Sequence, residues 1–429
     1  MAADMRLLGL VEEFVSGLQD GAAKDLATGV IDGKCTALEI VEALGKCLTN
    51  SEPRTRSRGI QLLSQVLLLS YSSLKQKEVE ALAIFYIDRL KDHYIITPYV
   101  LQGLKALSMS SVLPEGLAVI MLKALFQEVH VQSLMQSDRH SVYSIISNLM
   151  DTREQELKTL EADFTFGFIQ AMDGEKDPRN LLMAFQISRD IVVNNYELGN
   201  FVEELFEITS CYFPIDFTPP PNDPHGISQE ELVLSLRSVL TATPRFAEFL
   251  LPLLIEKLDS DVQSAKVDSL RTLTACCRDY RKKELKEFLP ALWHSIRREV
   301  FQTASEKIET EGLAALQALS TSLSKSVIDA DAEDSLDTFL DNVLQDCKHH
   351  LCEPDMKLVW PSAKLLQAAA SASYRACSKI NSCIFPLLLE QFNKHKQVKE
   401  GNMETYLGLI MPCVKGPFGT VSIESRPVL

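Results

Sequence analysis

The chain has 429 residues, 46% apolar and 24% charged, a balance that excludes a disordered protein and indicates a well-packed fold. Its formal net charge of −15 argues against nucleic acid as a direct ligand, because an acidic surface repels phosphate. Few glycines and prolines (18 of each) and a 7% aromatic share favour helices over a β-sandwich.

Amphipathic helical segments recur in pairs from the N-terminus to about residue 395. Two helices with one apolar face each cannot bury those faces alone, so each pair must stack on its neighbours. The pattern predicts an all-α, HEAT-type α-solenoid of about eight to nine antiparallel helix pairs, because its period is about 40 residues. Second helices are predicted to start near these residues: Arg54, Thr97, Asp138, Arg179, Ser228, Val262, Thr310 and Glu353.

The local chemistry of helix starts supports these positions. Asp177 precedes Pro178 and Thr243 precedes Pro244, which places a capping side chain before a residue without an amide hydrogen. Ser228 and Glu231 form a predicted capping box. Two basic runs, at 54–58 and 281–283, fit solvated helix faces better than a ligand-binding patch.

One segment breaks the rhythm. Residues 214–227 contain five prolines and cannot form a helix, so we predict an extended loop between repeats. It is either a plain surface connection or a partner-binding loop, with Pro219, Pro220, Pro221 and Asp223 as contact candidates. A second insertion, at 172–177, is predicted to be an acidic turn without the ligand spacing of a calcium loop.

Aromatic residues at alternate positions, Phe164, Phe166 and Phe168, are predicted to pack in the core. Because aromatic side chains also anchor protein interfaces, Phe164 and Phe166 are kept as candidate partner contacts.

The clearest helix pair runs from 249 to 277. Its first helix is predicted to bury these residues: Leu250, Leu253, Leu254 and Leu258. Its second helix is predicted to bury Val262, Ala265, Leu273 and Cys276, with Leu270 on the flank. The neighbouring pair of thiols, Cys276 and Cys277, is predicted to lie in the core.

Four potential metal ligands, Cys347, His349, His350 and Cys352, lie within six residues. Thiolates and imidazoles are ligands that zinc prefers, but four so close together cannot surround a tetrahedral ion. We therefore expect a helix end with histidines near its negative dipole, and keep a metal site as the alternative.

The C-terminal part changes character. A helix is predicted from Cys383 to Phe392, as the first member of a pair without its partner. Residues 1–396 are predicted to form one solenoid, and residues 397–429 an irregular, poorly ordered tail.

The sequence contains no phosphate-binding loop, dinucleotide fingerprint, HExxH or GxSxG motif. We expect no catalytic residues, no cofactor and no enzyme activity. Ten scattered cysteines without a CxxC pair indicate reduced thiols, and no apolar run reaches the ~18 residues of a membrane span. The expected location is therefore intracellular and soluble, in the cytosol or nucleus.

Several blocks resemble the N-terminal part of the MMS-nineteen family closely. They are EPRTRSRGIQLLSQVL from Glu52, ADFTFGFIQAMDGEKDPRNLL from Ala162, FVEELFEITSCYFPIDFTPPPNDPHGI from Phe201, TPRFAEFLLPLLIEKLDSDV from Thr243 and EPDMKLVWPSAKLLQAAA from Glu353. The resemblance covers about 5–396 and includes the proline loop and the acidic turn as whole phrases. It is closest to vertebrate members.

The resemblance implies a HEAT-repeat adaptor of the cytosolic iron–sulfur assembly targeting complex. Implied partners are the other targeting subunits and apo iron–sulfur helicases and DNA polymerases of replication, repair and transcription. It implies a location in cytoplasm and nucleus, with a spindle role, and brings no catalytic or cluster-binding residues.

The chain departs from the family after Lys396, as an alternatively spliced or truncated form would. Longer members carry C-terminal repeats associated with docking onto the other targeting subunits, so docking by this chain is in doubt. A chain that binds clients without docking would compete with the longer form. The alternative function is an importin-like carrier, whose acidic surface would bind basic cargo.

Overall fold

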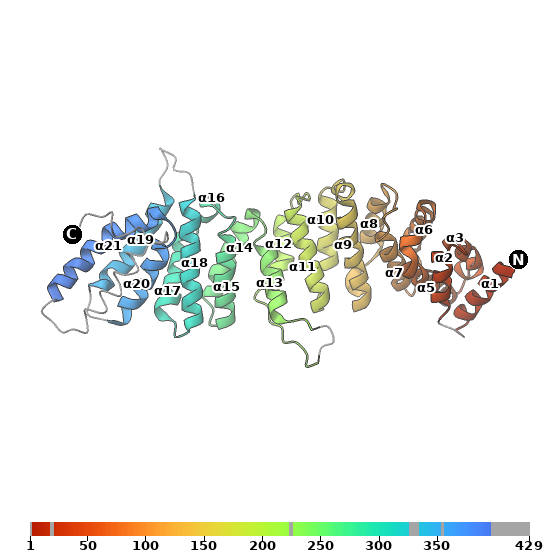
Figure 1. Ribbon diagram of the computed structural model, residues 1–429, viewed down its shortest axis with the longest axis horizontal. Helices are drawn as coiled ribbons and strands as arrows, with labels where there is room; N and C mark the ends of the chain where they lie inside the picture. Colours follow the sequence, from red (N-terminus) through yellow and green to blue (C-terminus); the bar gives the residue numbers. More distant parts are fainter. Residues whose placement is uncertain (1, 18–20, 223–225, 326–333, 353–355, 396–429) are drawn as a thin grey trace. The chain divides into compact units, whose positions relative to one another are not determined.

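The computed structural model describes residues 2–17, 21–222, 226–325, 334–352 and 356–395, and these residues form helices and connecting loops without a β-strand. They fold into two compact units, within residues 1–239 and 240–429. Figure 1 shows their helices in chain order. The predicted all-α, HEAT-type fold is confirmed. A single array across 1–396 stays a prediction, and the tail at 397–429 lies outside the described residues.

The first unit contains helices α1 to α13. Their bounds are α1 (Ala2–Val15), α2 (Ala22–Ile31), α3 (Ala37–Ala43), α4 (Gly45–Leu48), α5 (Pro53–Ser70), α6 (Gln76–Arg89), α7 (Thr97–Ser108), α8 (Leu117–Glu128), α9 (Gln136–Lys158), α10 (Ala162–Met172), α11 (Pro178–Val193), α12 (Val202–Ser210) and α13 (Gln229–Leu240).

The second unit contains helices α14 to α21. Their bounds are α14 (Ala247–Leu258), α15 (Gln263–Cys276), α16 (Lys282–Leu285), α17 (Leu289–Gln302), α18 (Glu306–Ser324), α19 (Ser335–Lys348), α20 (Met356–Ala370) and α21 (Tyr374–His395). Each of the eight predicted second helices is present and begins within about four residues of its expected start.

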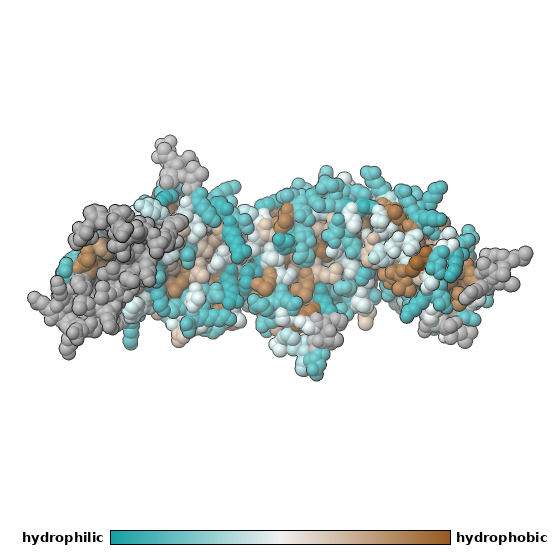
Figure 2. All heavy atoms as spheres, viewed as in Figure 1, coloured by the Kyte–Doolittle hydropathy of each residue, from teal (hydrophilic) through white to brown (hydrophobic). Residues whose placement is uncertain are grey.

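Each unit has two helix layers with the apolar core between them. In the first unit, α2, α5, α7, α9 and α11 pack side by side as one layer, and α6, α8, α10 and α12 form the other. In the second unit, α15, α18 and α20 form one layer, and α14, α17, α19 and α21 the other. Where Figure 2 colours the surface by hydropathy, hydrophilic residues predominate and hydrophobic residues form smaller patches between them.

The predicted helix caps are largely present. The Asp177 carboxylate accepts hydrogen bonds from the amides of Arg179 and Asn180 at the start of α11. The capping box before α13 is confirmed, since the Glu231 amide donates to Ser228 Oγ at 3.2 Å and the Ser228 amide donates to the Glu231 carboxylate at 2.7 Å. These side chains satisfy amides that a helix start leaves without partners.

The helix pair at 249–277 buries a slightly different set of residues than predicted. Leu250, Leu254 and Leu258 are buried, whereas Leu253 is only half-buried. Val262 is 53% exposed because it lies before the first turn of α15, and Leu270, placed on the flank by the sequence pattern, is fully buried. Both Cys276 and Cys277 lie in the core as predicted.

The last described helix was predicted too short. α21 begins at Tyr374, nine residues before the expected Cys383, and contains Pro386 in its interior, as predicted. A buried stripe at i, i+4 spacing explains the extension, because these residues face the neighbouring helices: Ala376, Ile380, Ile384 and Leu388. The packing energy of this stripe offsets the loss of the backbone hydrogen bond that Pro386 cannot make.

Among the described residues, no single helix is both long and apolar enough to cross a membrane; α13 meets that test only when joined to residues 244–258.

Gly103 in α7 marks a close approach between the two helices of one pair. A Cβ atom at this position would lie 2.0 Å from Cε1 of Tyr86, a fully buried residue of α6. The Ser64 hydroxyl donates to the Tyr99 carbonyl at 2.7 Å, so the Tyr86 hydroxyl donates to Ser64 at 2.7 Å. Tyr86 therefore cannot swing away without breaking a buried hydrogen bond.

We expect Gly103→Ala to lower the free energy of unfolding by about 2 kcal/mol, because the added methyl forces Tyr86 to move. This loss exceeds the ~1 kcal/mol that alanine ordinarily adds to a helix interior. Gly9→Ala in α1 is the matched control, since a Cβ there meets nothing within 4 Å. Thermal unfolding followed by circular dichroism measures both variants, and equal melting of Gly103→Ala and the parent chain would contradict the packing account.

Candidate partner-binding surface

The proline loop, residues 214–227, joins α12 to α13, and its described part contains no helix. Pro219, Pro220 and Pro221 are all exposed, and Asp223 lies outside the described residues. Figure 1 shows the loop projecting beyond the end of α13, away from the helices of the first unit. Three consecutive prolines favour an extended polyproline conformation with solvated carbonyls, a form that partner proteins can bind.

The base of the proline loop is fixed at both ends. Phe213 and Ile227 are buried, which inserts an apolar anchor at each end of the segment. The Gln229 side-chain amide donates to the Ile215 carbonyl at 3.0 Å and so closes the base. The exposed prolines therefore extend from a fixed base.

A tyrosine connects this base to the preceding repeat. The Tyr212 hydroxyl donates to the Glu175 carbonyl at 2.7 Å, and its ring packs edge-on against Phe185 of α11 at 5.6 Å between centroids. The start of the proline loop thus rests on the turn between α10 and α11, residues 173–177.

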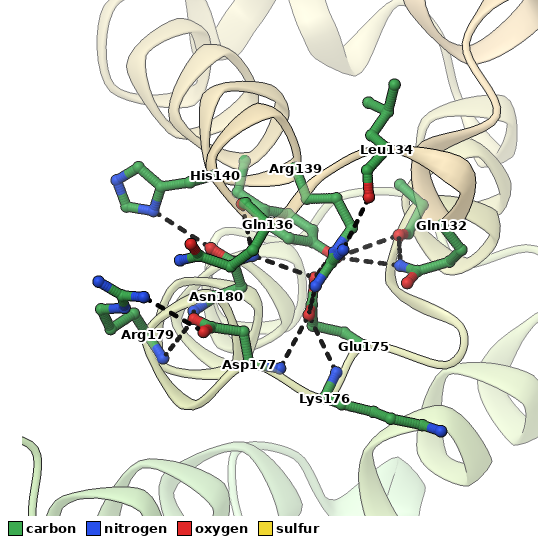
Figure 3. A network of polar contacts seen from close by, with 12 residues as sticks. Gln132, Leu134, Gln136, Arg139, His140, Glu175, Lys176, Asp177, Arg179 and Asn180 are labelled. Atoms are coloured by element: carbon green, nitrogen blue, oxygen red, sulfur yellow. Dashed lines mark hydrogen bonds and ion pairs between the residues drawn. The ribbon is translucent and has the colours of Figure 1, made fainter.

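The Glu175 side chain is the centre of this turn. It is fully buried, and its two carboxylate oxygens accept hydrogen bonds from Nε and Nη2 of Arg139, at 2.8 and 2.9 Å (Figure 3). The amides of Lys176 and Asp177 donate to the same carboxylate at 2.9 Å each, and the Tyr143 hydroxyl donates at 3.1 Å. A buried carboxylate with so many donors is satisfied rather than available for chemistry.

The network extends from the turn to two helices of the same layer. The Asn180 side-chain amide of α11 donates to the Gln136 carbonyl at 3.2 Å, and its carbonyl oxygen lies 3.2 Å from Nδ1 of His140 in α9. Figure 3 shows these residues gathered around Glu175 and Arg139. Polar contacts therefore tie α9, α11 and the turn together beneath the proline loop.

The pKa values in this network follow from its geometry. Burial raises the pKa of Glu175, but the hydrogen bonds from Arg139 and from the Asp177 and Lys176 amides lower it by more. The net pKa therefore lies below the usual glutamate value. Burial also raises the pKa of Tyr143, and the negative charge of Glu175 adds to that shift. The ionised Glu175 and the neutral Tyr143 are thus the stable forms.

The sequence pattern predicted an acidic turn at 172–177 but not the burial of Glu175 or its pairing with Arg139. A spacing signal was present: Arg139 and Glu175 are 36 residues apart, as are Arg56 and Asp92, which form the equivalent pair between α5 and the turn after α6. Arg56 donates to both carboxylate oxygens of Asp92, at 2.6 and 3.2 Å. An arginine early in a second helix, with an acid one repeat later, could therefore have identified both pairs.

The two candidate aromatic contacts, Phe164 and Phe166, have different environments in the structure. Phe164 is fully buried, so its assignment as a partner contact is wrong; its ring stacks on Tyr196 at 4.8 Å between centroids. Phe166 is 46% exposed and lies 5.3 Å from the ring of Phe201. Alternate residues on a helix point to different sides, which explains why only Phe166 faces solvent.

The cysteine–histidine cluster does not converge on one point. Cys347 is buried in the core, where burial and the nearby Asp346 raise its pKa to about 12, whereas Cys352 is exposed. His349 and His350 pack together at 3.9 Å between centroids. No group of three or more His, Cys, Asp or Glu side chains in the described part of the chain is placed to hold a metal ion.

We expect Glu175→Gln to lower the free energy of unfolding by about 3 kcal/mol, because it leaves Arg139 without its buried charge partner. Glu207→Gln, on an exposed position of α12, removes the same charge and is expected to change stability by less than about 0.5 kcal/mol. Chemical denaturation of both variants checks this difference. Similar losses in the two variants would show that net charge, and not the buried pair, is responsible.

Acid should weaken the first unit through the same pairs. The folded pKa values of Glu175 and Asp92 lie below their ordinary values, so their stabilisation is present above the ordinary carboxyl pKa, about 4, and is lost as pH falls through the folded values. Melting temperatures measured from pH 7 to pH 3 should fall below pH 4, less steeply in Glu175→Gln. Parallel pH profiles would exclude Glu175 as a contributor.

Comparison with known proteins places this region in a family. Residues 41–302 match the family model MMS19_N, described as "Dos2-interacting transcription regulator of RNA-Pol-II". Among solved structures, the karyopherin Kap121p bound to the extreme C-terminus of the protein phosphatase Cdc14p is similar in fold, with a TM-score of 0.51. That likeness covers 98% of this chain and 42% of the karyopherin at 14% sequence identity, so it supports the fold alone.

Full-length relatives share much of the sequence. The chain is 70% identical over 395 residues to the MMS19 nucleotide excision repair protein homolog of Xenopus laevis, covering 92% of this chain and 39% of that protein. It is 67% identical over 406 residues to the Homo sapiens homolog, covering 94% and 39%. The Drosophila melanogaster MMS19 nucleotide excision repair protein is 32% identical over 381 residues, covering 88% and 39%. The chain thus spans about two fifths of their length, and by the family match over more than half of its residues it belongs to the MMS19 N-terminal family.

Proposed function

We propose that this chain is a non-enzymatic adaptor that presents apo-proteins of DNA replication, repair and transcription to the cytosolic iron–sulfur assembly machinery. Family membership supports a role connected with repair and transcription, since the relatives are named for nucleotide excision repair and the family is described as a transcription regulator. The iron–sulfur part of the proposal rests on the resemblance of the sequence to the MMS-nineteen family.

The observation that carries the adaptor role is the construction of the proline loop. Its exposed prolines extend from a base fixed by Phe213, Ile227 and the Tyr212–Glu175 hydrogen bond. A fixed base with an extended, proline-stiffened tip loses little conformational entropy when a partner binds. Exposed Phe166, on α10, offers a separate apolar contact on the first unit.

The charged groups of the site support a role without catalysis. Glu175, the carboxylate at the centre of the network, is saturated by Arg139, Tyr143 and two amides. A general acid or base needs hydrogen-bond access to a substrate, which a fully buried and fully paired carboxylate lacks. The polar network therefore serves to position the proline loop.

We further propose that this region contacts clients and that docking onto the other targeting subunits needs repeats found in longer family members. The chain spans only 39% of its vertebrate relatives, and the resemblance assigns docking to C-terminal repeats. We propose a location in cytoplasm and nucleus, including the spindle, where the client enzymes of DNA metabolism act.

An importin-like carrier is the second candidate. The net charge of −15 favours basic cargo through complementary fields, and such binding weakens steeply with salt. The adaptor proposal requires instead contacts with folded apo-enzymes that persist at high salt.

Affinity capture of the tagged chain from cells tests the proposal, with iron–sulfur helicases and polymerases scored separately from targeting subunits. We expect replacement of the three prolines by Pro219→Gly, Pro220→Ser and Pro221→Gly to reduce client recovery at least about threefold, because the preformed tip is lost. Pro252→Ala, at an exposed proline of α14, is the matched control and should leave recovery unchanged.

Unchanged client recovery by the triple variant would contradict the role of the proline loop. Recovery of basic cargo that disappears between 150 mM and 500 mM salt, without iron–sulfur enzymes at either salt concentration, would overturn the adaptor proposal in favour of the carrier.

A further inference from the structure

The second unit contains a hollow of about 520 Å³ between α17, the helical turn His349–Leu351 and α20. This hollow, named here the arginine–histidine pocket, is lined by His294, Arg297, Arg298, Phe301, Gln302, Asp346, His349, His350 and Leu358. It includes both histidines of the cysteine–histidine cluster. Two arginines, three histidines and a glutamine give this lining many hydrogen-bond donors, against the single carboxylate of Asp346.

Arg297 has guanidinium donors that make no hydrogen bond within the described structure. Its Nη1 lies 2.6 Å from the Asp346 carboxylate, and Asp346 also accepts a 2.7 Å hydrogen bond from the Trp293 indole. The remaining guanidinium donors of Arg297 have no partner among the described residues. Because a guanidinium has five donors, Arg297 can bind a second anion while it keeps Asp346.

Arg298, the neighbouring cation, has no such capacity. It pairs with Asp259 at 2.5 Å, donates to the Leu258 carbonyl at 2.7 Å and contacts Glu299 at 3.2 Å. These bonds hold the end of α14 against α17. Arg298 is thus part of the pocket wall, and Arg297 is the residue able to bind a ligand.

Two imidazoles and an amide add hydrogen-bonding capacity. His294, His349 and Gln302 are exposed, and their side chains make no hydrogen bond to another described residue. An anionic oxygen bound at Arg297 would have these groups lining the same hollow. Asp346, the one acid of the lining, is paired with Arg297 and accepts a hydrogen bond from the Trp293 indole.

One wall of the pocket is aromatic and fixed in place. The Phe301 and His350 rings meet edge to face, with centroids 5.3 Å apart and planes at 81°. His350 is oriented by a 3.0 Å hydrogen bond between its Nδ1 and the Ser362 hydroxyl. With Leu358, this wall offers apolar contact beside the cationic group.

We propose that the arginine–histidine pocket binds an acidic segment of a partner protein, with an aspartate or glutamate carboxylate on Arg297 and an adjacent aromatic or aliphatic side chain on the Phe301–His350 wall. The unused guanidinium donors of Arg297 favour a carboxylate, and the hollow has room for about two side chains. A net charge of −15 opposes an extended nucleic acid backbone. The assignment goes beyond the adaptor proposal and does not depend on it.

Fluorescence anisotropy with the purified full chain and a fluorescein-labelled peptide, GDEFEDG, tests the assignment at 50 mM salt. We expect Arg297→Gln to weaken binding about tenfold or more, because a charge-assisted hydrogen bond is lost. His294→Ala and His349→Ala should each weaken binding about threefold, because a hydrogen-bonding side chain is lost. Arg278→Gln removes the same charge at an exposed position outside the pocket and should change affinity less than about twofold. The amide peptide GNQFQNG should not bind.

Four results would overturn the assignment: no binding of GDEFEDG, equal weakening by Arg278→Gln and Arg297→Gln, equal binding of GNQFQNG, or displacement of the peptide by micromolar inorganic phosphate or a short oligonucleotide. The histidine variants keep the test decisive if Arg297→Gln unfolds, because both side chains are exposed and make no hydrogen bond within the described structure.

Discussion

A helix pair can bury its apolar face only against the next pair, and this constraint governs the structure. The layers formed by α5, α7, α9 and α11, and by α15, α18 and α20, follow from it. Apolar contact alone fixes the relative rotation of neighbouring pairs poorly, since it is not directional. Ion pairs between consecutive repeats can fix this rotation, because they are directional. Arg56 joins the start of α5 to Asp92 in the turn after α6, and Arg139 joins the start of α9 to Glu175 in the turn after α10.

The second of these pairs also connects fold to function. Glu175 accepts bonds from Arg139 through its side chain, while its carbonyl accepts from Tyr212 at the start of the proline loop. The same residue therefore stabilises the stack and fixes the base of the loop. In the second unit, Arg298 holds α14 against α17 while its neighbour Arg297 keeps donors for an outside ligand. In both units, a polar contact that stabilises the fold (Glu175 with Arg139, and Arg298 with the end of α14) lies next to a group that can bind a partner (the proline loop, and Arg297).

Features that depend on neighbouring residues could be predicted from the sequence, whereas pairs between distant residues could not. The helix starts and the proline loop were predicted because capping residues such as Asp177 and Ser228, and clustered prolines, act within a few positions. The burial of Glu175 depends on Arg139, 36 residues earlier, so the local pattern of the acidic turn did not reveal it. The exposure of Phe166 beside buried Phe164, and the earlier start of α21 at Tyr374, depend on which neighbouring helix covers each face.

Amide hydrogen exchange at residues 211–216 and 173–177, compared between the parent chain and Glu175→Gln, tests most directly whether the Arg139–Glu175 pair holds the proline loop in place. The account predicts that protection falls in both segments together, while the protection of α18 in the second unit is unchanged. Loss of protection in the turn with an unaltered loop base would contradict it, because the loop would then be held independently of the network.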